Sequence, residues 1–210
     1  MPTIQGTPLS FPATSMTNGN PMGVPSGYMG ELVTSPFLGK YSSLVKAGKV
    51  FSAYATLTAP VIYSTAAGTG GPLLWNRSSS GVDAHILAVG FSTSVVTTVA
   101  GGLGLTGGPG QVAAPTSTTA IDASGNMLIG GPASACTTYR VGTPVAAGLQ
   151  LVPFAQVHTG ALTVDTTGVC WVDFEGGMIV PPGSWGSVAG TASLTTLQVQ
   201  VALIWAELPH

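Results

Sequence analysis

The feature that most limits the fold is an alternation of apolar and polar residues near the C-terminus, in residues 194–205. From position 197 onward every odd position is apolar: Leu197, Val199, Val201, Leu203 and Trp205. Polar Thr196, Gln198 and Gln200 stand between them. Because successive side chains of a strand point to opposite faces, this pattern predicts a half-buried β-strand.

Other segments predict further strands of the same kind. Residues 50–58 place Phe51, Ala53, Ala55 and Leu57 on one face, and residues 169–175 place Cys170, Val172 and Phe174 inward. Residues 84–92 are apolar on both faces, which predicts a buried, central strand. Residues 177–185 predict two strands joined by a tight corner at Pro181-Pro182-Gly183.

Turn signals punctuate the rest of the chain, and convincing helices are scarce. Residues 73–76 predict a short strand, residues 41–49 allow one amphipathic turn, and residues 100–115 predict a Gly-rich loop. Eight or more short strands at this spacing predict an all-β, jelly-roll-like antiparallel β-sandwich over residues 40–210.

Residues 1–39 show no sustained period and predict an extended N-terminal arm, interrupted by six prolines. Apolar side chains scattered along the arm are candidates for partner contacts: Ile4, Leu9, Phe11, Met16, Met22 and Tyr28. We expect the arm to lie on its own domain or on a neighbouring subunit, because these side chains are poorly placed in water. A flexible tail without fixed contacts is the alternative for about the first twenty residues.

Charge is unusually scarce in this chain. Charged residues make up 6% of it, against about 25% in ordinary globular proteins, while 45% is hydrophobic. Disordered chains show the opposite composition, so a folded protein is expected. A surface made mainly of Ser, Thr, Gly and Ala suits close contact with copies of itself or with a partner.

Composition also argues against several partners. The net charge of −2 and the lack of a basic cluster argue against nucleic acid, and no apolar run is long enough for a membrane span. The N-terminus shows no basic region followed by an apolar stretch, so we expect no export signal. Cys136 and Cys170 are then expected as buried, reduced thiols, with a disulfide as the alternative.

Two glycine- and acid-containing patterns fail as cofactor or metal sites. Residues 102–107 match G-x-G-x-x-G, but Pro109 follows, where a phosphate-binding helix would have to begin. Asp122, Ser124 and Asn126 resemble the first ligands of a calcium loop, which needs a Gly and a Glu that are missing, so we expect a hairpin turn. No cofactor and no metal are predicted.

Catalytic groups are equally isolated. His85 lies inside an apolar strand and is expected to be a hydrogen-bonded core residue. Gly183-Ser184-Trp185-Gly186 misses the nucleophile elbow by one residue. Asp173 and Glu175 share a strand face and are expected to be unpaired acids on a solvated edge. We therefore predict no enzyme.

Aromatic residues leave a binding function open. Tyr54, Tyr139 and Trp185 are candidates for stacking on sugar rings if they are exposed, although packing in a core or interface is the commoner fate. A carbohydrate-binding module, free or at the tip of a fibre, is thus the alternative function.

The C-terminal third carries a family resemblance. Residues 177–183 (GMIVPPG), 184–188 (SWGSV) and the closing segment 204–209 (IWAELP) resemble the end of jelly-roll structural proteins of tailed bacteriophages. The resemblance implies a virion protein made in the host cytoplasm. It is expected to be a cement or decoration protein on the capsid surface, with a domain of a phage head fibre or tail fibre as the alternative. The resemblance also implies a homotrimer that binds the major capsid protein and performs no chemistry.

Overall fold

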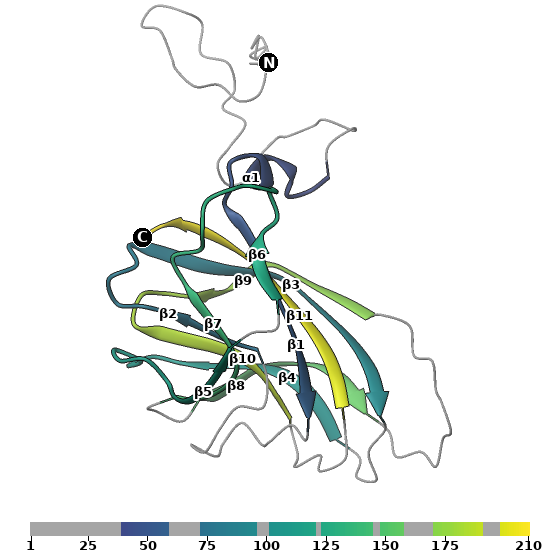
Figure 1. Ribbon diagram of the computed structural model, residues 1–210. Coiled ribbons are helices and arrows are strands. Elements are labelled where there is room, and N and C mark those ends of the chain that lie inside the picture. Colours follow the sequence, from purple (N-terminus) through teal and green to yellow (C-terminus); the bar gives the residue numbers. More distant parts are fainter. Residues whose placement is uncertain are drawn as a thin grey trace, which may run out of the picture.

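The structure is a computed structural model that describes residues 39–58, 72–95, 101–120, 123–144, 148–157, 170–190 and 198–210. These residues form one short helix, α1 (Ser42–Lys46), and eleven strands (Figure 1). The strands are β1 (Val50–Thr58), β2 (Leu73–Asn76), β3 (Val82–Val95), β4 (Gly101–Gly108), β5 (Thr116–Ala120), β6 (Ala123–Asn126), β7 (Thr137–Thr143), β8 (Leu149–Val157), β9 (Cys170–Val180), β10 (Ser184–Gly190) and β11 (Gln198–Pro209). No helix in these ranges is long and apolar enough to cross a bilayer.

Two antiparallel sheets form a sandwich with jelly-roll connectivity. The five-stranded sheet has the order β6-β1-β11-β3-β9, and the six-stranded sheet has the order β5-β7-β2-β10-β4-β8. Within them, β1-β11-β3-β9 faces β2-β10-β4-β8, the nested pairing that two Greek keys produce. The predicted all-β, jelly-roll-like sandwich is therefore confirmed.

Strands β5, β6 and β7 are an insertion between β4 and β8. β6 extends the five-stranded sheet beside β1, while β7 and β5 extend the six-stranded sheet beside β2. The expected hairpin turn at residues 122–126 is wrong for this reason. Ser124, Gly125 and Asn126 belong to β6 and pair with β1, so the chain changes sheets here instead of folding back on itself.

The closing strand β11 is the central strand of its sheet, between β1 and β3. Val199, Val201, Leu203 and Trp205 are buried, as their period predicts. Leu197 lies outside the described residues. The strand continues past the predicted end to Pro209, because Ala206, Glu207 and Leu208 still pair with β3.

The corner at Pro181-Pro182-Gly183 is confirmed and joins the two sheets. Gly183 has a φ of 77°, a conformation that glycine adopts without strain. Its N–H donates to the carbonyl of Asn76, and its carbonyl accepts from the N–H of Gln111. These bonds fix the passage from β9 to β10, which belong to different sheets.

The expected Gly-rich loop at 100–115 is wrong over residues 101–108, which form the interior strand β4. Leu103 and Leu105 are buried in the core. Gly107 permits a close approach to β10, since a Cβ there would lie 2.7 Å from the backbone oxygen of Trp185. Glycine content usually indicates a loop, but here close packing of two backbones requires it.

Helix α1 realises the amphipathic turn expected at 41–49. Tyr41, Leu44 and Val45 pack against a small apolar cluster of Val50, Leu87 and Ala206. This cluster lies on the outer side of the five-stranded sheet, separate from the main core between the sheets. Among the residues that the structure describes, the helix covers one end of this sheet face and leaves the rest of it open.

Candidate binding surfaces

Three consecutive apolar side chains form an exposed tip on the insertion, just after β6. Met127 and Leu128 are exposed, and Ile129 is 99% exposed. We call residues 127–129 the apolar tip. Three consecutive exposed apolar side chains make the apolar tip a candidate contact site.

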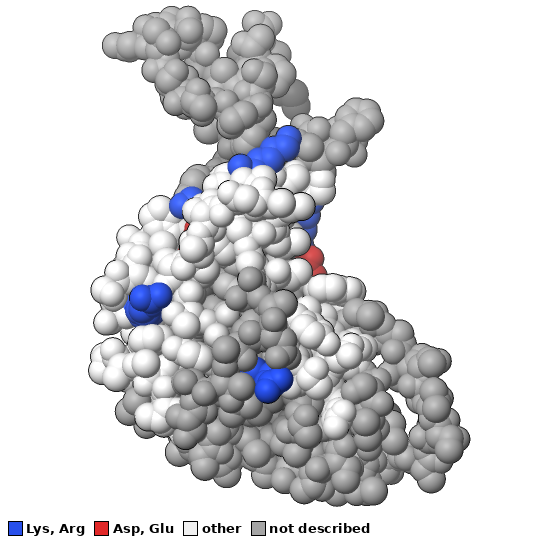
Figure 2. Space-filling view, viewed as in Figure 1, with Lys and Arg blue, Asp and Glu red and all other residues white. Residues whose placement is uncertain are grey.

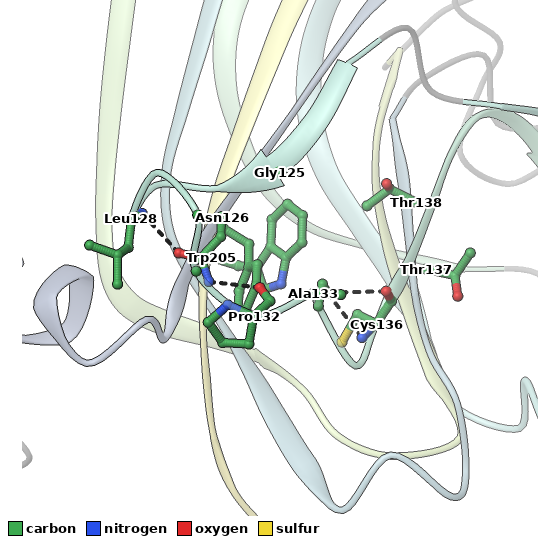
Figure 3. Close-up of a pocket in the computed structure, with 13 residues that line it drawn as sticks. Gly125, Asn126, Leu128, Pro132, Ala133, Cys136, Thr137, Thr138 and Trp205 are labelled. Carbon is green, nitrogen blue, oxygen red and sulfur yellow. Dashed lines mark hydrogen bonds between the residues drawn. The ribbon is translucent and has the colours of Figure 1, made fainter.

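Asn126 holds the apolar tip in place (Figure 3). Its side-chain amide donates to the carbonyls of Gly48 and Pro132, both at 2.9 Å, and its carbonyl oxygen accepts the N–H of Leu128 at 2.8 Å. The N–H of Met127 also donates to the carbonyl of Val50. The tip is therefore tied to the turn that follows α1.

Basic residues collect at the same end of the molecule. All three lysines of the chain, Lys40, Lys46 and Lys49, fall within ten residues around α1. The α1 segment and the loop after β6 lie together at the top of Figure 1. On the face drawn in Figure 2, the other charged side chains form isolated spots among uncharged described residues. We call α1, its flanking lysines and the apolar tip the α1 end.

Lys40 anchors the start of α1 to β9. Its ammonium group forms ion pairs with Glu175 and, at 3.0 Å, with Asp173, which also accepts the Tyr41 hydroxyl at 2.9 Å. The expectation of unpaired acids is therefore wrong, because β9 brings both carboxylates under a lysine 133 residues away in sequence from Asp173.

The same contacts shift the pKa values of the three groups. The hydrogen bond to Glu175 raises the pKa of Lys40 above its usual 10.5. Partial burial, and then the bond to Asp173, raise the pKa of Tyr41. For Asp173, slight desolvation opposes ionisation, but hydrogen bonds from Lys40, the Glu175 N–H and Tyr41 outweigh it and lower the pKa below 3.8.

A pocket of about 500 Å³ lies behind the apolar tip (Figure 3). Phe51 and Trp205 line it and stack on each other with ring centroids 5.9 Å apart. Asn126, Thr137 and Thr138 add polar groups to the wall.

A buried carboxylate, that of Glu207, holds the wall of this pocket through hydrogen bonds to residues 134–136. Glu207 is 4% exposed and accepts hydrogen bonds from the backbone N–H groups of Ala135 (2.9 Å) and Cys136 (3.3 Å). It also accepts from the Ser134 hydroxyl and from the Trp205 indole at 3.1 Å. Four donors satisfy a charge that would otherwise be costly to bury, so Glu207 ties the insertion to β11.

Cys136 is buried and free, as expected. Desolvation, followed by the neighbouring Glu207 carboxylate, raises the pKa of its thiol far above 9.0. A protonated, buried thiol is a poor nucleophile, which favours a packing role. The side chain of Cys170 lies outside the described residues.

The aromatic candidates for sugar stacking are only partly exposed. Trp185 lies on the outer face of the six-stranded sheet, but Gly148 packs over its ring. It is therefore only 2% exposed and cannot serve as a platform for sugar stacking. Tyr139 is half-buried and Tyr54 is 37% exposed. The exposed tryptophan is Trp171 on β9, at 56%. Sequence reasoning missed it, although placing Val172 and Phe174 inward puts Trp171 outward.

The other sequence candidates are scattered. His85 is not in the core: it is half-buried and lines a shallow groove beside α1, because Ala84 and Ile86 occupy the inward positions. Ser184 is buried at the start of β10. Within the described ranges, no group of three or more His, Cys, Asp or Glu side chains is placed to hold a metal ion.

The six arm residues predicted to contact a partner, Ile4, Leu9, Phe11, Met16, Met22 and Tyr28, lie outside the described residues. No protein-family model matches the chain, and no curated protein matches it.

Proposed function

We propose that this protein is a structural virion protein that works by adhesion, as a capsid cement or decoration protein of a tailed bacteriophage. In this proposal it binds the major capsid protein and stabilises the phage head. Support comes from the resemblance of the C-terminal third and from the jelly-roll sandwich that carries so few charges. Such a surface has little to keep it from close contact with neighbours.

The observation that carries the proposal is the apolar tip beside α1. Ile129 is almost wholly exposed, and Asn126 fixes the backbone that presents it. A fixed apolar anchor loses little conformational entropy on binding. Asn126 and Met127 hydrogen-bond to Gly48 and Val50, the chain neighbours of Lys49, so the α1 end suits a capsid surface with an apolar pocket bordered by acidic groups. The α1 end is also where the chain arrives from residues 1–38, the predicted arm.

A homotrimer is the proposed assembly. Closed rings use the same surface of every copy, so a three-fold arrangement lets three α1 ends face the capsid together. Three linked contacts raise the overall affinity without any new contact type. Light scattering on the purified protein should then give three times the chain mass of 20.9 kDa.

Co-sedimentation tests the proposal. The full chain and a chain lacking residues 2–35 are mixed with phage capsids that do not carry the protein, and bound protein is measured after centrifugation. We expect the full chain to bind, and the shortened chain to remain trimeric but to lose binding. Failure of the full chain to bind any capsid would refute the function, and undiminished binding by the shortened chain would refute the role of the arm.

The tip is tested separately with Ile129→Ser. We expect at least a tenfold loss of capsid affinity, because removing a well-packed anchor from an interface costs more than about 1.4 kcal/mol. Val112→Ser is the matched control, since Val112 is 71% exposed on another loop. Equal binding by both variants and the wild type would show that the α1 end does not face the capsid.

A further inference from the structure

The open part of the five-stranded sheet carries a row of residues that runs across four strands. Tyr54 on β1 pairs with Ala202 on β11, Ala202 pairs with Gly90 on β3, and Gly90 pairs with Trp171 on β9. All four lie on the outer face, because their strand neighbours Ala53, Val201 and Val89 are buried inward. We call these four residues the aromatic row.

The aromatic row has an aromatic side chain at each end and almost no side chain between. The Cα atoms of Tyr54 and Trp171 are three strand spacings apart, or about 14 Å. The indole of Trp171 reaches inward over Gly90: a Cβ at Gly90 would lie 2.9 to 3.0 Å from three carbons of its six-membered ring. The ring therefore occupies the space that glycine leaves free, and Gly90 is required for it to lie there.

This packing fixes the ring but leaves more than half of the side chain open to solvent. If the only role of Trp171 were to cover the backbone of Gly90, burying more of its apolar ring would stabilise the fold further. Held in place by the sheet, it offers a large apolar surface that loses little entropy when a ligand stacks on it.

The residues beside the aromatic row determine which ligand suits it. One neighbouring row is Thr56, Gln200 and Ser92, in which the Ser92 hydroxyl lies 3.5 Å from the side-chain oxygen of the exposed Gln200. These side chains offer uncharged donors and acceptors. On the other side, the only charge in the paired row is Asp173, and Lys40 already neutralises it.

We infer that the aromatic row is a binding site for a neutral carbohydrate chain. Sugar rings have apolar C–H faces that stack on indole and phenol rings, and hydroxyl groups that pair with amides and hydroxyls such as those of Gln200 and Ser92. A nucleic acid or an acidic glycan needs free cations, whereas Lys40, the lysine beside this face, is already paired with Asp173 and Glu175. A wholly apolar partner would leave the polar row unpaired, at a free-energy cost. The inference does not depend on capsid binding, and it would let the same protein attach to glycans while its α1 end is engaged.

A glycan array of neutral and acidic oligosaccharides, probed with the full-length protein, tests the inference. Titration calorimetry then measures affinity for the neutral oligosaccharide that binds best. Trp171→Ala should weaken binding about tenfold or more. Tyr54→Ala should also weaken it, and this second variant leaves the cover over Gly90 intact. Ile179→Ala is the matched control, because Ile179 is an exposed apolar residue on the same strand and face but outside the row.

Tryptophan fluorescence gives an independent readout. Of the four tryptophans, Trp185 and Trp205 are buried and Trp75 is half-buried, so a blue shift on adding the sugar reports Trp171 and should disappear in Trp171→Phe. The inference is overturned if the wild type binds no neutral glycan, if it binds only acidic ones, or if both alanine variants bind as well as Ile179→Ala. A fall in oligomer mass in Trp171→Ala without glycan binding by the wild type would assign the face to a second copy instead.

Discussion

Removing the Glu207 carboxylate tests how the insertion is held to the jelly roll. In Glu207→Ala the N–H of Ala135 and the indole N–H of Trp205 lose their acceptor, whereas the N–H of Cys136 keeps the Ser134 hydroxyl at 3.0 Å. Each buried donor left unsatisfied costs about 1–3 kcal/mol. Two of them give at least about 2 kcal/mol, and water entering from the adjacent pocket keeps the cost near that lower end.

We therefore expect Glu207→Ala to lower the free energy of unfolding by about 2–4 kcal/mol, a large fraction of the stability of an ordinary domain. Glu207→Gln keeps the shape and one acceptor oxygen but turns an NH2 group toward the donors, so its loss should be smaller, at about 1–3 kcal/mol. The order of the two variants follows from the number of acceptors that each one retains.

Urea denaturation followed by tryptophan fluorescence and by far-UV circular dichroism measures these losses. Glu175→Ala is the control, because it removes the same residue type from an exposed ion pair and should cost under about 1 kcal/mol. If Glu207→Ala cost no more than Glu175→Ala, the buried carboxylate would not be holding residues 134–136, and the explanation given for the wall of the pocket would be wrong.

Three further predictions concern packing, thiol chemistry and pH. Gly107→Ala should cost about 1–3 kcal/mol in the same denaturation assay because its Cβ would meet the Trp185 backbone, whereas Gly125→Ala, whose Cβ would meet nothing within 4 Å, should be near neutral; equal costs would contradict the close approach of β4 and β10. Iodoacetamide at pH 8 should leave Cys136 unmodified in the folded protein and alkylate it after denaturation, as read by peptide mass spectrometry, and rapid labelling of the native protein would show that the thiol is accessible. Because the pKa of Asp173 is lowered on folding, its contribution to stability is present above pH 3.8 and is lost as the pH falls through the folded-state value. Asp173→Asn should thus lower the free energy of unfolding by under about 1 kcal/mol at pH 7, and this difference from the wild type should disappear in acid. A difference that does not change with pH would contradict the ion pair.

The exposed surfaces were only partly accessible to sequence reasoning. Alternation in residues 169–175 fixes the outward direction of Trp171, but only the pairing of β9 with β3 shows that its ring lies over Gly90. The same limit applies to Trp185, which the sequence offered as a candidate for an exposed aromatic residue. Its burial depends on Gly148, which comes from a different part of the chain.

The sequence by itself determined which segments are β-strands. The alternation of apolar and polar residues in β1, β9 and β11 is a local property, and it can be recognised without knowing which strands pair with which. The scarcity of charge was equally plain from the residues. Only the tertiary structure decided that a glycine-rich stretch is the interior strand β4, and that Glu207 is enclosed by donors 71 to 73 positions away. The physical reason is that a glycine or a carboxylate carries no local signal of its environment: its role is set by the strand or loop that folding brings against it.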